Sequence, residues 1–482
     1  MTSVLGREAL KERLASIVGP EKVLTDPETL EKYSTDQSFV EPRMPLLVVQ
    51  PGTTKEVQEI LKLANHLRVP VTPYTSGMNN QGASIPTGGG IVVDTSKMNK
   101  IIDIDEVHRV ATVEVGVTFN QLQDEAKKHG LRVLTPAELP ASASVVTTYI
   151  EYVPLYSWPR YEEENLLTMH LVLPTGEIMK TGAAAVPAVR PPYDPMGAAV
   201  FSFLNKIWFG AQGTLGIVTR AVVKLKTLYK ENEVFFIPFE EVKDVIKPLR
   251  EIQWSRIGEE RFVTNSTNLS LTIAEKVPED FIELRPNLPP WTLVLVLRGS
   301  KERVEYEKED LKELSSKLKV ELMKEVGGRK EAEEMVLKEI AYPGGWRKTS
   351  QYKGASNTLP FIVPAKRIVE CDKVVQRLAE RHEYPREDIG CTLIPANVSI
   401  MCCQLRFARD PTKPEETEKT RKLFYETANQ LLMTTGAFFS RPYGPLAELV
   451  YSRAPTYYST IRKFKQMVDP NEIMAPGKIF IF

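Results

Sequence analysis

The strongest constraint on the fold is a strand–helix–strand pattern that leads directly into a loop of small polar residues. The run PLLVVQP at 45–51 indicates a buried strand, and residues 69–73 indicate a second one. Between them, apolar residues recur at helical spacing: Val57, Ile60, Leu61 and Ala64. A crossover of this length places the two strands parallel in one sheet. The stretch PYTSGMNNQGASIPTGGGIVVDTSKM, residues 73–98, therefore leaves the end of a strand where α/β folds bind ligands.

This loop contains too few large apolar groups to form a core. Glycine permits positive φ and a close approach of the backbone, and successive exposed N–H groups in such a turn bind anions. The side chains of Thr75, Ser76, Asn79 and Asn80 add further donors. Residues 76–83 are therefore interpreted either as a diphosphate site or as a tight surface turn.

Two other nucleotide-binding patterns are absent from the sequence. No GxxxxGK[ST] motif occurs, and the nearest match to GxGxxG is GAQGTLG at 210–216. The strand-like run IVTRAVVKL follows that match, so no helix N-terminus is offered to a pyrophosphate. A Rossmann-type NAD site is not expected there.

The charge balance narrows the class of partner. Basic and acidic residues number 62 each, so the formal net charge of the 482 residues is zero. Nucleic-acid binding favours a basic excess, so a small-molecule substrate is expected and nucleic acid is not. No apolar run reaches membrane-spanning length, and the start MTSVLGREALKERL has no signal-peptide pattern. A cytoplasmic protein without a membrane span is predicted.

The cysteines and histidines form no pattern typical of a metal site. None of the four cysteines makes a CxxC pair, and no HExxH or similar spacing occurs. Cys402 and Cys403 lie in the strand-like run SIMCCQLRF, where neighbours point to opposite faces. Buried free thiols and no bound metal are predicted.

Several segments, in their order along the chain, resemble the vanillyl-alcohol oxidase/p-cresol methylhydroxylase (PCMH) superfamily of flavoproteins. The segments are residues 45–84, IVVDTSKMNKIIDIDEVHRVATVEVGVTFNQLQ, MHLVLPTGEIMKTG, GAQGTLGIVTRAVVKL and, near the end, DPNEIMAPGKIF. The resemblance implies an α+β chain with a two-domain PCMH-type FAD-binding fold and an α/β cap domain.

The secondary-structure pattern along the chain indicates the domain bounds, and the resemblance indicates which domain binds FAD. Residues 1–228 are expected to form the FAD-binding domain, with a PCMH-type core at about 41–228. The strand-then-helix repeats of 229–435 are expected to form the cap or substrate domain. Residues 436–482, read as a helix, a turn and a closing strand, are expected to return to the FAD-binding domain.

FAD is the cofactor that the resemblance implies. The matching positions for its binding are Thr75, Ser76, Gly77, Met78, Asn79, Asn80, Gln81, Gly82, Ala83, Pro136, Ala137, Glu138, Gly216, Ile217, Val218, Arg441 and Lys478. Relatives with covalent FAD carry a His or Tyr in a cap strand, and the matching stretch PANVSIMCCQ has neither. Non-covalent FAD is therefore expected.

The catalytic hypotheses centre on two places. Arg441, in TTGAFFSRPYG, resembles an arginine that faces substrate and flavin in the aromatic-alcohol branch, and its fixed charge suits a developing anion. Its alternative role is an ordinary ion pair at a domain boundary. The base is sought among Glu162, Glu163 and Glu164, which otherwise form a solvated loop.

Three functions are compatible with these patterns. The first is an FAD-linked oxidase or dehydrogenase of an alcohol, including aromatic or alkylphenol-like alcohols, by hydride transfer. The second is a D-2-hydroxy-acid dehydrogenase of the lactate or glycolate type that passes electrons to a protein acceptor. The third is a non-catalytic flavin-binding subunit. An electron-acceptor protein and a homo-oligomer are left open as partners.

Overall fold

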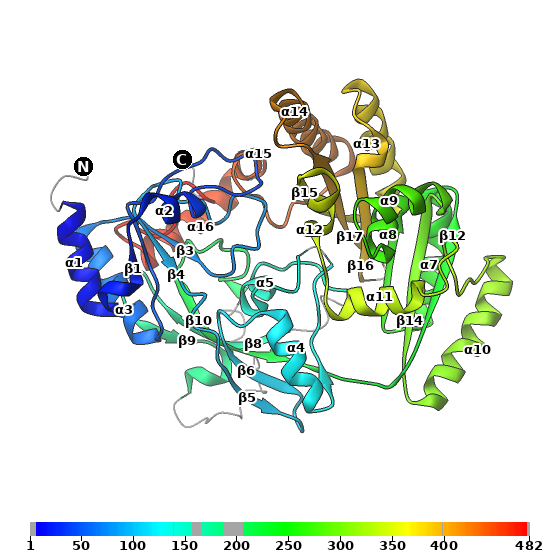
Figure 1. The fold of residues 1–482 in the computed structure, drawn as a ribbon, viewed down its shortest axis with the longest axis horizontal. Coiled ribbons are helices and arrows are strands. Elements are labelled where there is room, and N and C mark those ends of the chain that lie inside the picture. The colour runs from blue at the N-terminus through cyan, green and yellow to red at the C-terminus, as the bar shows by residue number, and fades with distance from the viewer. Residues whose placement is uncertain (1–5, 138, 157–164, 187–205, 398, 480–482) are drawn as a thin grey trace.

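The computed structural model describes residues 6–137, 139–156, 165–186, 206–397 and 399–479. It shows two lobes side by side, each built around sheets with covering helices, and both chain ends lie on the lobe at the left of Figure 1. This mixed architecture confirms the α+β prediction.

The predicted strand–helix–strand unit is present in the left lobe. Strand order in its four-stranded sheet is β1 (Val23–Leu24), β2 (Leu47–Val49), β4 (Ile91–Asp94) and β3 (Val71–Tyr74). Helix α3 (Thr54–Leu67) connects β2 to β3, and both strands run parallel to β4, which lies between them. The hydroxyl of Thr53 accepts a 3.1 Å hydrogen bond from the Glu56 N–H and caps α3. The loop of interest leaves the carboxyl end of β3.

A second, antiparallel sheet of five strands completes this lobe. Its order is β5 (Ile101–Asp105), β6 (Val110–Glu114), β10 (Ile217–Lys224), β8 (Leu166–Val172) and β9 (Ile178–Lys180). Other elements here are α1 (Arg7–Val18), η1 (Pro20–Lys22), α2 (Pro27–Lys32), α4 (Phe119–Lys128), α5 (Val145–Ile150), η2 (Gly182–Ala185) and the pair β7 (Leu131–Arg132) with β11 (Lys226–Thr227). One apolar core joins both sheets and the helices α1, α3, α4 and α5 to Ile473 and Met474.

The right lobe is a six-stranded sheet with helices packed on it. Its order is β12 (Glu231–Phe239), β14 (Trp291–Gly299), β13 (Glu260–Asn265), β16 (Ile389–Asn397), β17 (Ile400–Arg409) and β15 (Ala355–Pro364). Cys402 belongs to the core on one face and Cys403 to the core on the other, as the alternation predicts. All four cysteines are buried and free, which confirms that prediction.

The helices of the right lobe follow its strands in sequence. They are α7 (Val242–Trp254), α8 (Ser266–Ile273), α9 (Glu279–Leu284), η4 (Arg285–Asn287), α10 (Lys301–Leu318), α11 (Ala332–Ala341), α12 (Trp346–Lys353), η5 (Ala365–Arg367), α13 (Ile368–Arg381), η6 (Arg386–Asp388) and α14 (Pro414–Gln430), which the π-helical turn η7 (Leu431–Thr435) extends. The segment CTLIPANVSIMCCQLRFARD, expected to form the single strand of a strand–helix pair, is in fact the hairpin β16–β17, and the expected helix after it is α14.

Through α15 (Pro445–Tyr451) and α16 (Pro455–Val468), the chain returns to the left lobe. The end of the expected closing strand, residues 480–482, lies outside the described residues; before it, a single bridge joins Met474 to Val71. The Val71 N–H donates to the Ile473 carbonyl at 2.8 Å, and the Ala475 N–H donates to the Val71 carbonyl at 2.7 Å. The tail therefore lies beside β3, at the base of the loop that follows this strand.

A buried charge cluster ties the two lobes together. Glu260 on β13 is fully buried and pairs with Arg132 of β7 at 2.8 Å and with Arg298 of β14 at 2.7 Å. Burial alone raises the pKa of Glu260, but the two guanidiniums outweigh it and hold that pKa below its ordinary value. Removing one partner would leave an uncompensated buried charge, so the cluster fixes the lobes against each other.

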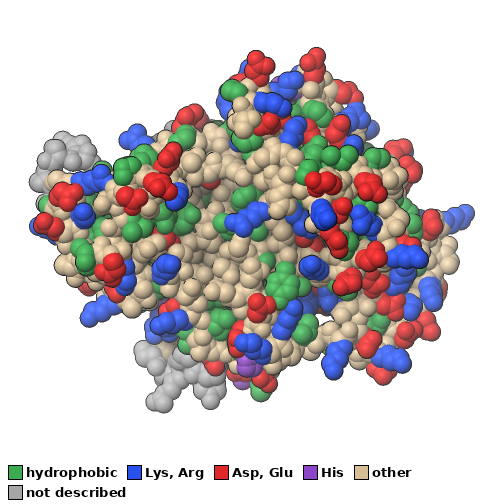
Figure 2. All heavy atoms as spheres, viewed as in Figure 1, with side chains coloured by type: hydrophobic (Ala, Val, Ile, Leu, Met, Phe, Trp, Pro, Cys, Tyr) green, Lys and Arg blue, Asp and Glu red, His purple; other side chains and the backbone are tan. Residues whose placement is uncertain are grey.

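The surface carries both signs of charge. In Figure 2, acidic and basic side chains are interspersed over the right lobe, and the strip between the lobes shows fewer of them. Among the described residues, no helix combines the length and apolarity needed to cross a bilayer. The cytoplasmic location stays a prediction.

Candidate functional site

A cavity opens in the left lobe where four segments meet. They are the loop after β3, the region of α5, the residues that precede β10, and the loop that holds Arg441 and Tyr443. Together they enclose about 1140 Å³ of space not filled by protein atoms, including open solvent at the mouth.

The loop after β3 presents unused backbone donors to this cavity. The N–H groups of residues 76–80 make no hydrogen bond with any residue that the structure describes. The loop is braced by its own side chains: Ser76 Oγ accepts from the Ser144 N–H at 3.2 Å, and Asn79 Oδ1 accepts from the Gln81 N–H at 2.7 Å. A row of fixed amides without acceptors is suited to phosphate oxygens.

Two charged residues hold the far end of this loop at Gly82. Asp36 Oδ2 accepts from the Gly82 N–H at 2.7 Å, and Lys478 Nζ donates to the carbonyls of Gly82 at 2.6 Å and of Ile85 at 2.5 Å. Burial lowers the pKa of Lys478 to about 8 and raises the pKa of Asp36. Neither residue lines the cavity, so the two position the loop.

Glycines bring the backbone close at two points of the site. Gly82 has φ +83°, and a Cβ there would collide with the side chain of Val40. Gly216 has φ +136°, and a Cβ there would meet the backbone carbonyl of Val172 on β8. Larger residues at either position would be strained and would displace their neighbours.

At its polar end, the cavity brings together an acid, a phenol and a guanidinium. Glu151 lies just past the end of α5 and is partly buried, whereas Arg441 and Tyr443 are buried. The Tyr443 hydroxyl donates to Glu151 Oε2 at 2.5 Å. Burial raises the pKa of Glu151, against the opposing effects of the Tyr443 hydrogen bond, the Arg441 charge and the Gln212 N–H. A carboxyl group with a raised pKa in a cavity is suited to proton transfer.

Other buried polar atoms of this cavity lack a hydrogen-bond partner among the described residues. They include Thr148 Oγ1 and Gln212 Oε1. Such groups are costly to leave unpaired, so a polar ligand would satisfy them.

The structure gathers most of the predicted cofactor-binding residues around this cavity. Those that line it are Thr75, Ser76, Gly77, Met78, Asn79, Asn80, Gln81, Ala83, Gly216, Ile217, Val218 and Arg441. Pro136 instead pairs with Leu155, and the carbonyl of Ala137 accepts from Arg406 at 2.9 Å. The roles of all these residues stay predictions. Glu138, Glu162, Glu163 and Glu164 lie outside the described residues.

Glu151 and Tyr443 are candidates that the sequence interpretation did not name. The two are 292 residues apart in the chain, so no local motif joins them. One signal was available: Glu151 is the single charge in the run VVTTYIEYVPLY. Acids are rarely buried unless they are paired or functional, so an isolated one in an apolar run is informative.

Comparisons with known proteins give a consistent result. A model of the "FAD binding domain" matches residues 45–182, and a model of "FAD linked oxidases, C-terminal domain" matches residues 229–479. An uncharacterized FAD-linked oxidoreductase of Mycobacterium tuberculosis is 25% identical over 97% of this chain and 98% of its own. A D-lactate dehydrogenase of Anaerostipes hadrus is 30% identical over 48% of this chain and 46% of its own.

A solved structure is similar over nearly the whole chain. The crystal structure of p-cresol methylhydroxylase with substrate bound has a TM-score of 0.83 at 20% identity, covering 98% of this chain and 96% of that one. This similarity agrees with the fold that the sequence predicts.

Proposed function

Since this chain belongs to the FAD-linked oxidases of the vanillyl-alcohol oxidase/p-cresol methylhydroxylase superfamily, we propose that it oxidises an alcohol, with aromatic and alkylphenol-like alcohols as its substrate class. It is an FAD-dependent oxidoreductase, and a non-catalytic flavin-binding subunit is therefore not the favoured function. The domain bounds 1–228, 229–435 and 436–482 are part of the proposal, supported by the return of the tail to β3.

The residues around the cavity fit FAD. The unused amides of residues 76–80 suit its diphosphate, and the unpaired atoms of Thr148 and Gln212 suit its polar groups. We propose that FAD is held without a covalent bond, because the stretch PANVSIMCCQ offers neither a His nor a Tyr.

The observation that carries the proposal is the meeting of Glu151, Tyr443 and Arg441 at one end of this cavity. When bound, FAD supplies the acceptor for a hydride. Glu151 takes the hydroxyl proton of the alcohol, and Tyr443 orients its carboxylate through the hydrogen bond to Oε2. Arg441 keeps its charge when buried and stabilises negative charge that develops on the substrate.

A D-2-hydroxy acid is the second candidate substrate class. The relative named D-lactate dehydrogenase favours this class, and Arg441 would then bind the substrate carboxylate in a bidentate manner, through two parallel hydrogen bonds. In both cases Glu151 faces a hydroxyl group. An electron-acceptor protein and self-association stay predictions.

A substrate panel under anaerobic conditions tests the proposal. The FAD-loaded protein is mixed with 4-alkylphenols, benzylic alcohols, D-lactate and glycolate, and loss of flavin absorbance is followed by stopped flow. We expect bleaching by one of the first two classes. Bleaching by the hydroxy acids alone would instead support the second candidate.

Glu151→Gln tests the role of the acid. It should retain bound FAD and slow flavin reduction by about 10²–10⁴-fold, the usual contribution of a general base. Glu448→Gln, at an exposed position on α15, is the matched control and should behave as the wild type. Unchanged reduction in Glu151→Gln would remove Glu151 from the mechanism.

A further inference from the structure

A second cavity lies in the right lobe and shares no lining residue with the first. It is enclosed between α13 and the sheet strands β16 and β17, and it contains about 1060 Å³ of space not filled by protein atoms, including open solvent at its mouth. Nothing in the proposed oxidation uses this space.

The inner wall of this cavity is apolar and without charge. Cys371 on α13, Cys391 on β16 and Cys403 on β17 contribute to it, together with Phe361, Val375 and Leu405. Burial raises the pKa of Cys371 to about 11 and that of Cys391 and Cys403 well above the ordinary value, so all three thiols are uncharged. An apolar group would pack favourably against these side chains.

The mouth carries one cation that the protein does not use. The guanidinium of Arg285, on η4, is half-buried and makes no hydrogen bond or ion pair with any residue in the described ranges. Of the other charged residues that line the cavity, Arg386 pairs with Glu380, Asp372 accepts from Gln376 Nε2 at 2.6 Å, and Glu387 is exposed. Arg285 is therefore available to an anion from outside.

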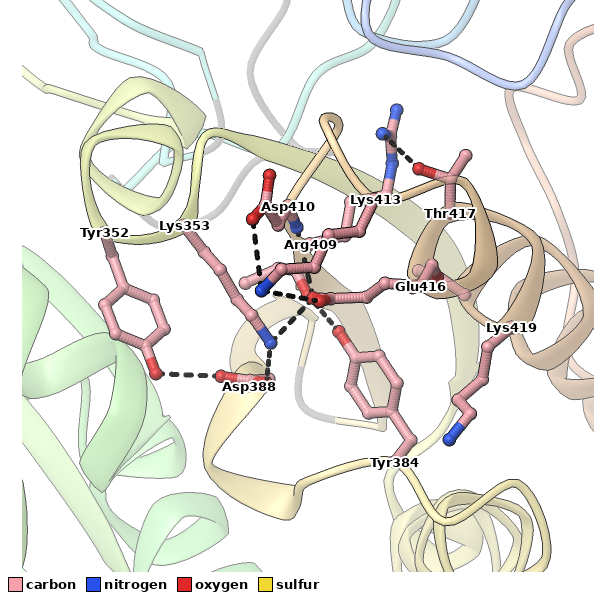
Figure 3. Close-up of polar contacts among 12 residues, drawn as sticks. Tyr352, Lys353, Tyr384, Asp388, Arg409, Asp410, Lys413, Glu416, Thr417 and Lys419 are labelled. Carbon is pink, nitrogen blue, oxygen red and sulfur yellow. Dashed lines mark hydrogen bonds and ion pairs between the residues drawn. The ribbon is translucent and has the colours of Figure 1, made fainter.

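The mouth is also held in place. Figure 3 shows Asp388 of η6 between Tyr352 and Lys353 of α12. The Tyr352 hydroxyl donates to Asp388 Oδ1 at 2.9 Å, and Lys353 pairs with Asp388 and, at 2.8 Å, with Glu416 of α14. These contacts fix η6, which lines the mouth through Arg386 and Glu387, so the cavity is formed before any ligand arrives.

We propose that this cavity binds a small amphiphilic anion, with its apolar body among the three cysteines and its carboxylate or similar group on Arg285. An apolar pocket with a small number of polar or charged groups is typical of sites that bind small molecules. Guanidinium groups bind carboxylates through two parallel hydrogen bonds, which gives the site its preference for charge.

Three ligands with the same ten-carbon chain and different head groups test the apolar cavity and the charge of Arg285 separately. Decanoate, decanol and decylamine are titrated into the FAD-loaded protein by calorimetry, below the concentration at which they aggregate. Decanoate should bind at least about ten-fold more tightly than decanol, as expected for a hydrogen bond to a charged group. Decylamine should bind most weakly. Equal binding of decylamine, or no binding of decanoate, would overturn the proposal.

Variants locate the binding. Arg285→Ala should weaken the affinity for decanoate by about ten-fold or more and leave the affinity for decanol unchanged. Arg347→Ala, at an exposed position on α12, is the control and should change neither. Cys371→Phe should fill the cavity and abolish binding of both ligands while the flavin spectrum is retained. Full decanoate affinity in Arg285→Ala would overturn the proposal, even if Cys371→Phe fails to fold.

Discussion

Lys478→Met should weaken FAD binding although Lys478 does not line the cofactor cavity. Its ammonium group donates to the carbonyls of Gly82 at 2.6 Å and Ile85 at 2.5 Å, and the side chain is 3% exposed. Methionine has a similar length and no donor. Each buried carbonyl left without a partner costs about 1–3 kcal/mol, so the loop would relax toward water in the apoprotein. For the two carbonyls, restoring its shape when FAD binds would then cost about 2–6 kcal/mol, which is an affinity weaker by about 30-fold to 20,000-fold.

Titration of the apoprotein with FAD, followed by flavin fluorescence, measures this loss. Lys463→Met, at an exposed position on α16, is the control and should bind FAD as the wild type does. An affinity of Lys478→Met within about three-fold of the wild type would refute the reasoning, because it would show that the loop keeps its shape without these bonds.

The same lysine predicts a dependence of stability on pH. Burial lowers the pKa of Lys478 to about 8 in the folded protein, whereas an unfolded lysine titrates near 10.5. Between about pH 8 and pH 10.5 this lysine is protonated in the unfolded chain and largely deprotonated in the folded protein. The free energy of unfolding therefore increases as pH rises from about 8 to about 10.5. In urea titrations of the apoprotein, this gain should be present in the wild type and absent in Lys478→Met.

Four further outcomes are expected. Gly82→Val should empty the flavin site, measured as the ratio of flavin to protein absorbance. The reason is that residue 82 has φ +83° and that a Cβ there collides with the side chain of Val40. Arg441→Ala should retain FAD and lose about 10²–10³ in the rate of flavin reduction, with partial recovery in Arg441→Lys. Tyr443→Phe removes a hydrogen bond that lowers the pKa of Glu151; because the base acts when deprotonated, the acid limb of the kcat/KM profile should move to higher pH. Acid precipitation should release yellow flavin into the supernatant; colour retained in the pellet would contradict non-covalent binding.

Local patterns in the sequence predicted local structure well. The helix at 54–67 and the parallel strands around it follow from spacing alone, and the structure contains them. The hairpin β16–β17 was missed because its turn has no glycine; the Asn397 side chain closes it by accepting from the N–H groups of Ser399 at 2.8 Å and Ile400 at 2.9 Å.

The candidate site was predictable only in part, for a physical reason. The loop at 76–83 is one continuous segment whose composition shows its backbone chemistry. The acid end instead depends on Glu151 and Tyr443 meeting across 292 residues of chain, a contact that tertiary packing alone creates. Glu162, Glu163 and Glu164 are adjacent in the sequence, whereas the partly buried Glu151 is isolated in an apolar run.

The bond between Lys478 and Gly82 has a consequence for the order of events in the cell. The two residues are 396 positions apart, so the ribosome makes the diphosphate loop long before it makes the lysine that holds the loop. The nearby segment at 473–475 that pairs with Val71 is equally late. A nascent chain thus has a complete loop sequence but an unbraced loop until residue 478 emerges. Tight loading of the cofactor is therefore a step that follows translation of the tail, and truncations before residue 478 should accumulate as colourless protein.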